Sequence, residues 1–182
     1  MRCDTYIPLL AVFTVGSAAV VAAPLEAHSE SHGAHVHGAA QLTFATDAEQ
    51  VELMFDSPAV NLLGFEHAPK SATEQAAWHK SLAMLNSGQW LQLPAEAQCE
   101  LQQQTINNPW STNSADKHQH ADIELTLRYR CKVPSALTEV RLDLFRHAAD
   151  LQNIAVQWVS GAHQGAVTLT PESSVFSLKT GG

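Results

Sequence analysis

Histidine is the residue type that stands out in this sequence, with 10 copies among 182 residues. Neutral imidazole is a common ligand of Zn²⁺ and also suits Cu²⁺ and Ni²⁺. Two H-x-H pairs are present, His35 with His37 and His118 with His120. On an extended chain this spacing puts both rings on one face about 6.6 Å apart, close enough to share one ion. The pattern therefore indicates metal binding.

Further candidate ligands lie near these pairs in the chain. Residues 23–38 are rich in His, Gly and Ser and poor in large apolar side chains, which predicts a flexible arm. Glu66 and His67 offer a carboxylate beside an imidazole, although adjacent side chains diverge on a strand and converge only in a turn. The predicted metal ligands are His28, His32, His35, His37, His67, Asp116, His118 and His120.

The sequence carries no recognisable catalytic signature. It lacks an H-E-x-x-H motif, a G-x-S-x-G elbow, a phosphate-binding glycine loop and a dinucleotide fingerprint. No catalytic residue is predicted, and a binding protein is favoured over an enzyme. Two alternatives remain: a small metal-dependent hydrolase with an open position on the ion, and a β-rich interaction module whose histidines are incidental.

The charge balance excludes two classes of partner. Lys and Arg number 10 against 18 Asp and Glu, giving a formal net charge of −8. A protein with this balance has no cationic surface for a nucleic acid or for an anionic membrane. The length and the 45% hydrophobic content predict a single globular domain.

The first 22 residues are typical of a secretory signal peptide. Arg2 precedes a continuous apolar run from Ile7 to Val21, and small residues follow at Ala22 and Ala23. The run is short for a membrane span, although an N-terminal anchor helix is the alternative. The expected location is the periplasm, with no membrane contact after cleavage.

The cysteine count agrees with export. Cleavage removes Cys3 and leaves Cys99 and Cys131, which predict one disulfide in an oxidising compartment. Two buried free thiols are the alternative. A thiolate metal site is disfavoured because no second close pair of cysteines is present.

The elements that must position the histidines are mostly strands. Leu42–Phe44 and Val51–Phe55 predict a β-hairpin, and Ile123–Val133 alternates apolar and polar residues most clearly. Ser71–Ser87 predicts a helix, with Ser71 and Glu74 at capping-box spacing and Gly88 placed to end it. Apolar alternation after residue 139 predicts further strands, although residues 135–150 also fit a helical period.

These elements predict a mainly β (α+β) fold, an antiparallel β-sandwich-like domain over residues 39–182 with one inserted helix. Each H-x-H pair precedes a predicted strand. The two pairs would complete a four-coordinate site if those strand starts are neighbours.

Two segments resemble one known family. The sequences His35-Val36-His37-Gly38-Ala39-Ala40-Gln41-Leu42 and Ser57-Pro58-Ala59-Val60-Asn61-Leu62-Leu63-Gly64-Phe65-Glu66-His67 are similar to the ZrgA family of periplasmic zinc-uptake proteins. The resemblance implies zinc binding in the periplasm of Gram-negative bacteria and assistance to a high-affinity zinc importer. It points to His35, His37 and the 118–120 loop as metal-binding positions, with Glu66 and His67 as motif residues.

The sequence departs from the family in one respect. Family members often carry a long His/Asp/Glu-rich insert before the strand at Ile123, whereas in this chain that region consists only of Ser111–His120. This lowers the number of ions expected. The resulting hypothesis is that the protein is a non-enzymatic zinc buffer or carrier whose partner is the periplasmic component of a zinc ABC importer. The alternative is a copper or nickel chaperone or detoxifier.

Overall fold

The computed structural model describes residues 36–107, 110 and 121–179. They fall within one compact unit, Gly33–Gly182. The predicted signal peptide and most of the predicted arm lie outside these residues, as do His28, His32, His35, Asp116, His118 and His120. Among the residues that are described, no helix is long and apolar enough to cross a membrane.

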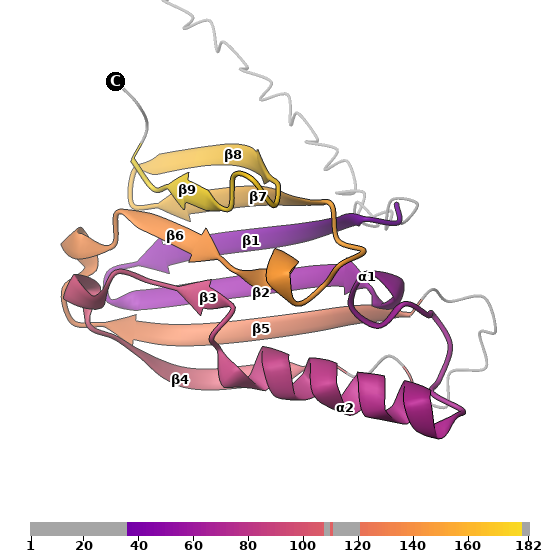
Figure 1. The fold of residues 1–182 in the computed structure, drawn as a ribbon. Coiled ribbons are helices and arrows are strands. Elements are labelled where there is room, and N and C mark those ends of the chain that lie inside the picture. Colours follow the sequence, from indigo (N-terminus) through magenta and orange to yellow (C-terminus); the bar gives the residue numbers. More distant parts are fainter. Residues whose placement is uncertain (1–35, 108–109, 111–120, 180–182) are drawn as a thin grey trace, which may run out of the picture. The chain divides into compact units, whose positions relative to one another are not determined.

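A six-stranded sheet forms the larger layer of the domain (Figure 1). Its strand order is β4-β5-β2-β1-β7-β8. These strands are β1 (Ala39–Asp47), β2 (Gln50–Pro58), β4 (Cys99–Ile106), β5 (Asp122–Cys131), β7 (Asn153–Ser160) and β8 (His163–Leu169). Neighbouring strands are antiparallel except β1 and β7, which are parallel. The predicted mainly β fold is confirmed, with one parallel pair that the sequence analysis did not anticipate.

A second layer covers one face of this sheet (Figure 1). It consists of α2 (Ala72–Ser87) and a three-stranded sheet of β3 (Leu91–Gln92), β6 (Glu139–Leu142) and β9 (Val175–Ser177). Phe44 of β1 meets Phe176 of β9 edge to face, with ring centroids 5.8 Å apart, and Phe55 of β2 packs near the fully buried Trp90. Alternating residues of β1, β2, β5 and β7 are buried in this core, because successive strand side chains point to opposite faces.

The predicted helix is confirmed, including both of its ends. Ser71 Oγ accepts a hydrogen bond from the Glu74 N–H at 3.2 Å, and Glu74 Oε2 accepts one from the Ser71 N–H at 2.9 Å. These are the two bonds of the predicted capping box. Gly88 ends the helix in the left-handed conformation, with φ at 66°.

Short elements fill the connections. α1 (Ala59–Leu63) is a single helical turn that follows β2 and that was not predicted. Residues 135–150 contain strand β6, as favoured over a helix, between two short 3-10 turns. The 3-10 turns are η1 (Ala95–Ala97), η2 (Pro134–Ala136) and η3 (Leu144–Arg146).

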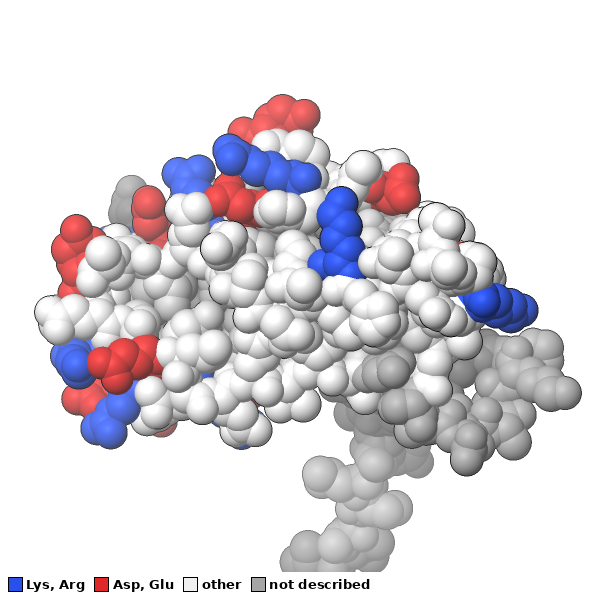
Figure 2. Space-filling view, turned by 60° about the horizontal axis from the view of Figure 1, so that its bottom comes forward, with Lys and Arg blue, Asp and Glu red and all other residues white. Residues whose placement is uncertain are grey.

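The predicted disulfide is present between the edge strand β4 and its neighbour β5. Cys99 and Cys131 are direct partners in the strand register, and their sulfur atoms are bonded. Ion pairs surround this end of the sheet, Lys132 with Glu100 at 2.7 Å and Arg130 with Glu49 at 2.8 Å. Figure 2 shows charged side chains gathered at one end of the domain and along one margin, around a broad uncharged area.

Candidate metal site

The opposite end of the larger sheet is where the sequence motifs converge. β1, β5 and β7 begin at this end and β2 ends there, because β2 runs antiparallel to β1 and β5 while β7 runs parallel to β1. The starts of β1 and β5 therefore share one end but are not adjacent. The end of β2 separates them by two strand spacings, about 10 Å.

Asn61 of α1 fixes the turn that leads into β1. Its side chain is 1% exposed. Asn61 Oδ1 accepts a hydrogen bond from the Gly38 N–H at 2.7 Å, and Asn61 Nδ2 donates to the Ala39 carbonyl at 2.8 Å and to Ser57 Oγ at 3.1 Å. The chain immediately after His37 is thereby held against α1. Sequence reasoning did not single out Asn61, although one amide among the apolar residues of α1 was a visible signal.

Gly38 needs a conformation that side chains disfavour. Its φ is +84°, and an added Cβ would lie 2.9 Å from Cδ of the Gln152 side chain. We expect Gly38→Ala to lower the free energy of unfolding by about 2 kcal/mol, measured by urea denaturation, because backbone strain adds to this contact. Gly161→Ala is the control, since Gly161 has φ of +58° and open space around it; it should cost about 1 kcal/mol. Equal losses would show that the Gln152 contact is unimportant.

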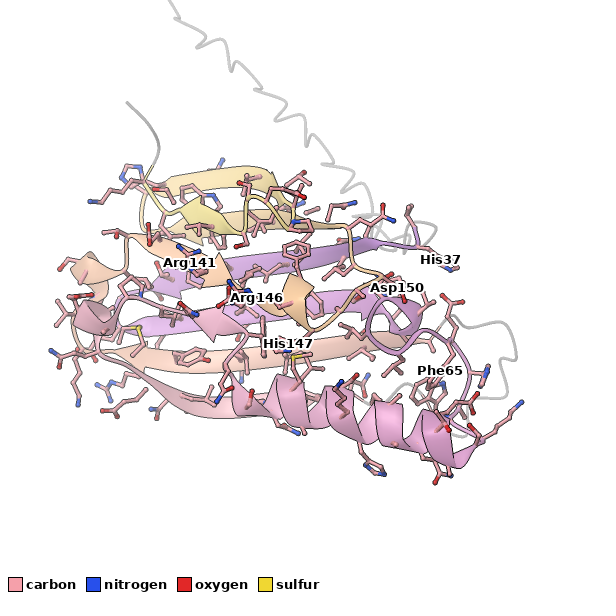
Figure 3. All side chains as sticks on the ribbon, viewed as in Figure 1. His37, Phe65, Arg141, Arg146, His147 and Asp150 are labelled. Atoms are coloured by element: carbon pink, nitrogen blue, oxygen red, sulfur yellow. A yellow bond between two sulfur atoms is a disulfide. The ribbon has the colours of Figure 1, made fainter. Side chains whose placement is uncertain are left out.

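His37 and Glu66 face each other at this end of the sheet. His37 Nε2 lies 3.1 Å from Glu66 Oε1, and the two side chains are 71% and 30% exposed. Two atoms that each lie about 2.0 Å from a tetrahedral zinc ion are about 3.3 Å apart. The nitrogen and the oxygen are thus separated by nearly the edge of a zinc coordination tetrahedron, and the donor types fit the ion. Figure 3 shows His37 at the same end of the domain as Phe65.

His67 turns away from its neighbour Glu66 toward a different carboxylate. Its ring stacks on Phe65 with centroids 5.3 Å apart. His67 Nε2 lies 3.7 Å from Glu74 Oε1. The backbone N–H groups of Ser71 and Lys70 hold the pKa of Glu74 below its usual value, so this carboxylate stays ionised at neutral pH. The loop after α1 therefore presents two separate His–Glu pairs.

An aromatic cluster borders these pairs. Trp110 meets Trp78 of α2 edge to face at 5.1 Å and stacks on Phe65 at 6.4 Å. The carbonyl of Ala121 accepts a hydrogen bond from the Ala59 N–H at 2.7 Å. Trp110 and Ala121 are the described residues on either side of 111–120, and both contact the α1–α2 region.

The described part of the chain contains no group of three or more His, Cys, Asp or Glu side chains that could hold a metal ion. The remaining described histidines lie elsewhere. His79 is exposed on α2, His147 is exposed after η3, and His163 is the first residue of β8, paired with Ser160. The His37–Glu66 and His67–Glu74 pairs are therefore the candidate ligand sets on which a site can be built.

One comparison with known proteins identifies a family. Residues 34–178 match the family model described as ZrgA family zinc uptake protein. The matched range contains both His–Glu pairs and the whole of the two-layered domain. No curated protein matches the chain.

Proposed function

Since the chain belongs to the ZrgA family of zinc uptake proteins, we propose that it is a periplasmic, non-enzymatic protein that binds zinc as cargo and buffers it or delivers it to the periplasmic component of a zinc ABC importer. Zinc uptake requires that an ion be captured and then released. An exposed site with few protein ligands suits this task, because water completes the coordination and the ion can leave.

The observation that carries this proposal is the His37–Glu66 pair. Its 3.1 Å separation and its exposure present a nitrogen and an oxygen ligand to solvent. Asn61 and the turn at Gly38 hold the chain beside His37 before any ion arrives. The backbone next to His37 therefore does not have to be ordered when zinc binds, which lowers the entropy cost of binding at this ligand.

We propose that further ligands come from two histidine-containing segments, the arm before residue 36 and the segment before β5. The candidates are His28, His32 and His35 in the arm, and Asp116, His118 and His120 before β5. Support comes from the described flanks, because Val36 is part of the turn into β1 and Ala121 bonds to α1. His37 and the start of β5 share one end of the sheet.

Glu66 supports the site in one of two ways. If His37 Nε2–H donates to Glu66, then Nδ1 of His37 is the zinc ligand and the carboxylate orients the ring, as is common for metal-binding histidines. If Nε2 is unprotonated, both side chains bind the ion directly. The two arrangements differ in how strongly Glu66→Gln weakens binding, since glutamine still accepts a hydrogen bond but is a poor zinc ligand.

Zinc titration of the untagged protein at pH 7 tests the proposal. We expect reversible zinc binding that His37→Ala weakens by about tenfold or more. Glu66→Gln should weaken zinc binding less than His37→Ala does if Glu66 only orients the ring, and about as much as His37→Ala does if Glu66 is a ligand. His79→Ala is the matched control, because His79 is exposed on α2 away from β1. Equal zinc affinities of His37→Ala and His79→Ala would refute the proposed site.

The same titration tests the segment before β5. Replacement of His118 and His120 together by Ala should lower the number or the affinity of bound zinc ions. Unchanged binding would remove that segment from the site. Competition by Cu²⁺ and Ni²⁺ reports the selectivity of the site, since raw affinity for nitrogen ligands favours copper.

A further inference from the structure

The two ring nitrogens of His67 have different partners. Its Nδ1 lies 3.1 Å from the backbone carbonyl oxygen of Ala68. A carbonyl oxygen only accepts hydrogen bonds, so Nδ1 carries the proton, and in neutral imidazole the lone pair is then on Nε2. A backbone carbonyl that holds one ring nitrogen in this way is the usual support for a metal-binding histidine.

The open nitrogen faces a second acceptor. His67 Nε2 lies 3.7 Å from Glu74 Oε1. The other oxygen of this carboxylate, Oε2, accepts hydrogen bonds from the Ser71 N–H at 2.9 Å and the Lys70 N–H at 2.8 Å. Two lone pairs that face each other across such a gap repel unless a cation or a second proton lies between them.

The gap has a size that suits a metal ion. Two ligand atoms at about 2.1 Å from zinc and 3.7 Å apart subtend an angle of about 120° or slightly more at the ion. Both side chains are held in place, Glu74 by the capping box of α2 and His67 by stacking on Phe65. They are 51% and 28% exposed, so water can supply the remaining ligands.

We propose that His67 and Glu74 form a second divalent-cation site, separate from the His37–Glu66 pair, in which Nε2 and Oε1 bind zinc and water completes the coordination. The inference rests on the proposed function because the cargo is the same. With two protein ligands, this site binds more weakly than one completed by further histidines. Zinc therefore binds to this site and dissociates from it rapidly.

Nuclear magnetic resonance of histidine ring nitrogens tests this proposal on the intact, untagged protein at pH 7 titrated with zinc sulfate. Without zinc, His67 should show the tautomer with the proton on Nδ1. Added zinc should shift the Nε2 resonance of His67. Glu74→Gln should weaken this response about tenfold or more, while leaving the response of His37 unchanged. Glutamine also supports a capping box, so α2 keeps its N-terminus.

Glu96→Gln, at an exposed position of η1, is the matched loss of one carboxylate and should leave both responses unchanged. A His67 resonance that does not move at saturating zinc, while His37 responds, would overturn this inference and leave the proposed function standing. A His67 ring protonated on both nitrogens at pH 7 and insensitive to zinc would overturn it as well. If neither histidine responds, the proposed zinc binding fails too.

Discussion

Asn61→Ala should lower the free energy of unfolding by about 3 kcal/mol and weaken zinc binding in the same variant. The side chain is 1% exposed and satisfies the Gly38 N–H, the Ala39 carbonyl and the Ser57 hydroxyl. Each buried polar group left without a partner costs about 1–3 kcal/mol, reduced where water reaches it. Because the bond to Gly38 fixes the residue that follows His37, its loss also releases the proposed ligand. Urea denaturation and zinc titration measure the two effects.

Asn86→Ala is the control for this substitution. Asn86 is exposed on α2 and accepts one hydrogen bond from Gln104 at 2.8 Å. Its replacement should change the unfolding free energy by less than about 0.5 kcal/mol and leave zinc binding unchanged. If the Asn61 and Asn86 variants were equally stable, the buried amide would not hold the turn before β1.

Replacing Cys99 and Cys131 together by Ser should lower the free energy of unfolding by about 4 kcal/mol, the chain-entropy value for a loop of 32 residues. The disulfide lies at the end of β5, whereas the candidate metal site lies near its beginning, about 30 Å away along a ten-residue strand. Zinc affinity of the folded variant should therefore be unchanged. This separates a loss of fold stability from a loss of ligands.

Reductant provides the control for the disulfide. It should destabilise the wild-type protein by a similar amount in urea denaturation and have no effect on the double Ser variant. A wild-type protein whose unfolding midpoint does not change under full reduction would contradict the predicted stabilisation. The hydrogen bonds and packing between β4 and β5 would then be sufficient for the full stability of the protein.

Local chemistry made part of this fold predictable. The Ser71–Glu74 capping box and Gly88 set both ends of α2, and the alternation of apolar residues in β5 marked its buried face. The strand β4 was missed because its polar residues are exposed on both faces, so no alternation marks an edge strand of this kind. The five-residue α1 is too short to show a helical period.

The candidate site was predictable only as a set of residue types. His37 and Glu66 both lie in recognisable motifs, but their contact joins positions 29 residues apart and depends on how β1 and α1 pack. The pairing of His67 with Glu74 depends on the capping box, which orients one carboxylate oxygen away from the helix. The parallel pairing of β1 with β7 is equally non-local and leaves no periodic signal.

That parallel pair also determines when the site can form during folding. Thr46 of β1 bonds to Ser160 of β7 across 114 residues of sequence, which gives the domain a high contact order. Strand pairings of this kind form slowly, because a long loop must close before its contacts stabilise the chain. The turn that carries His37 is bonded to the start of β7 through Gly38, so we expect this turn to be completed among the last steps of folding. Zinc should therefore bind only after the domain has folded, and we expect the refolding rate to be independent of zinc concentration.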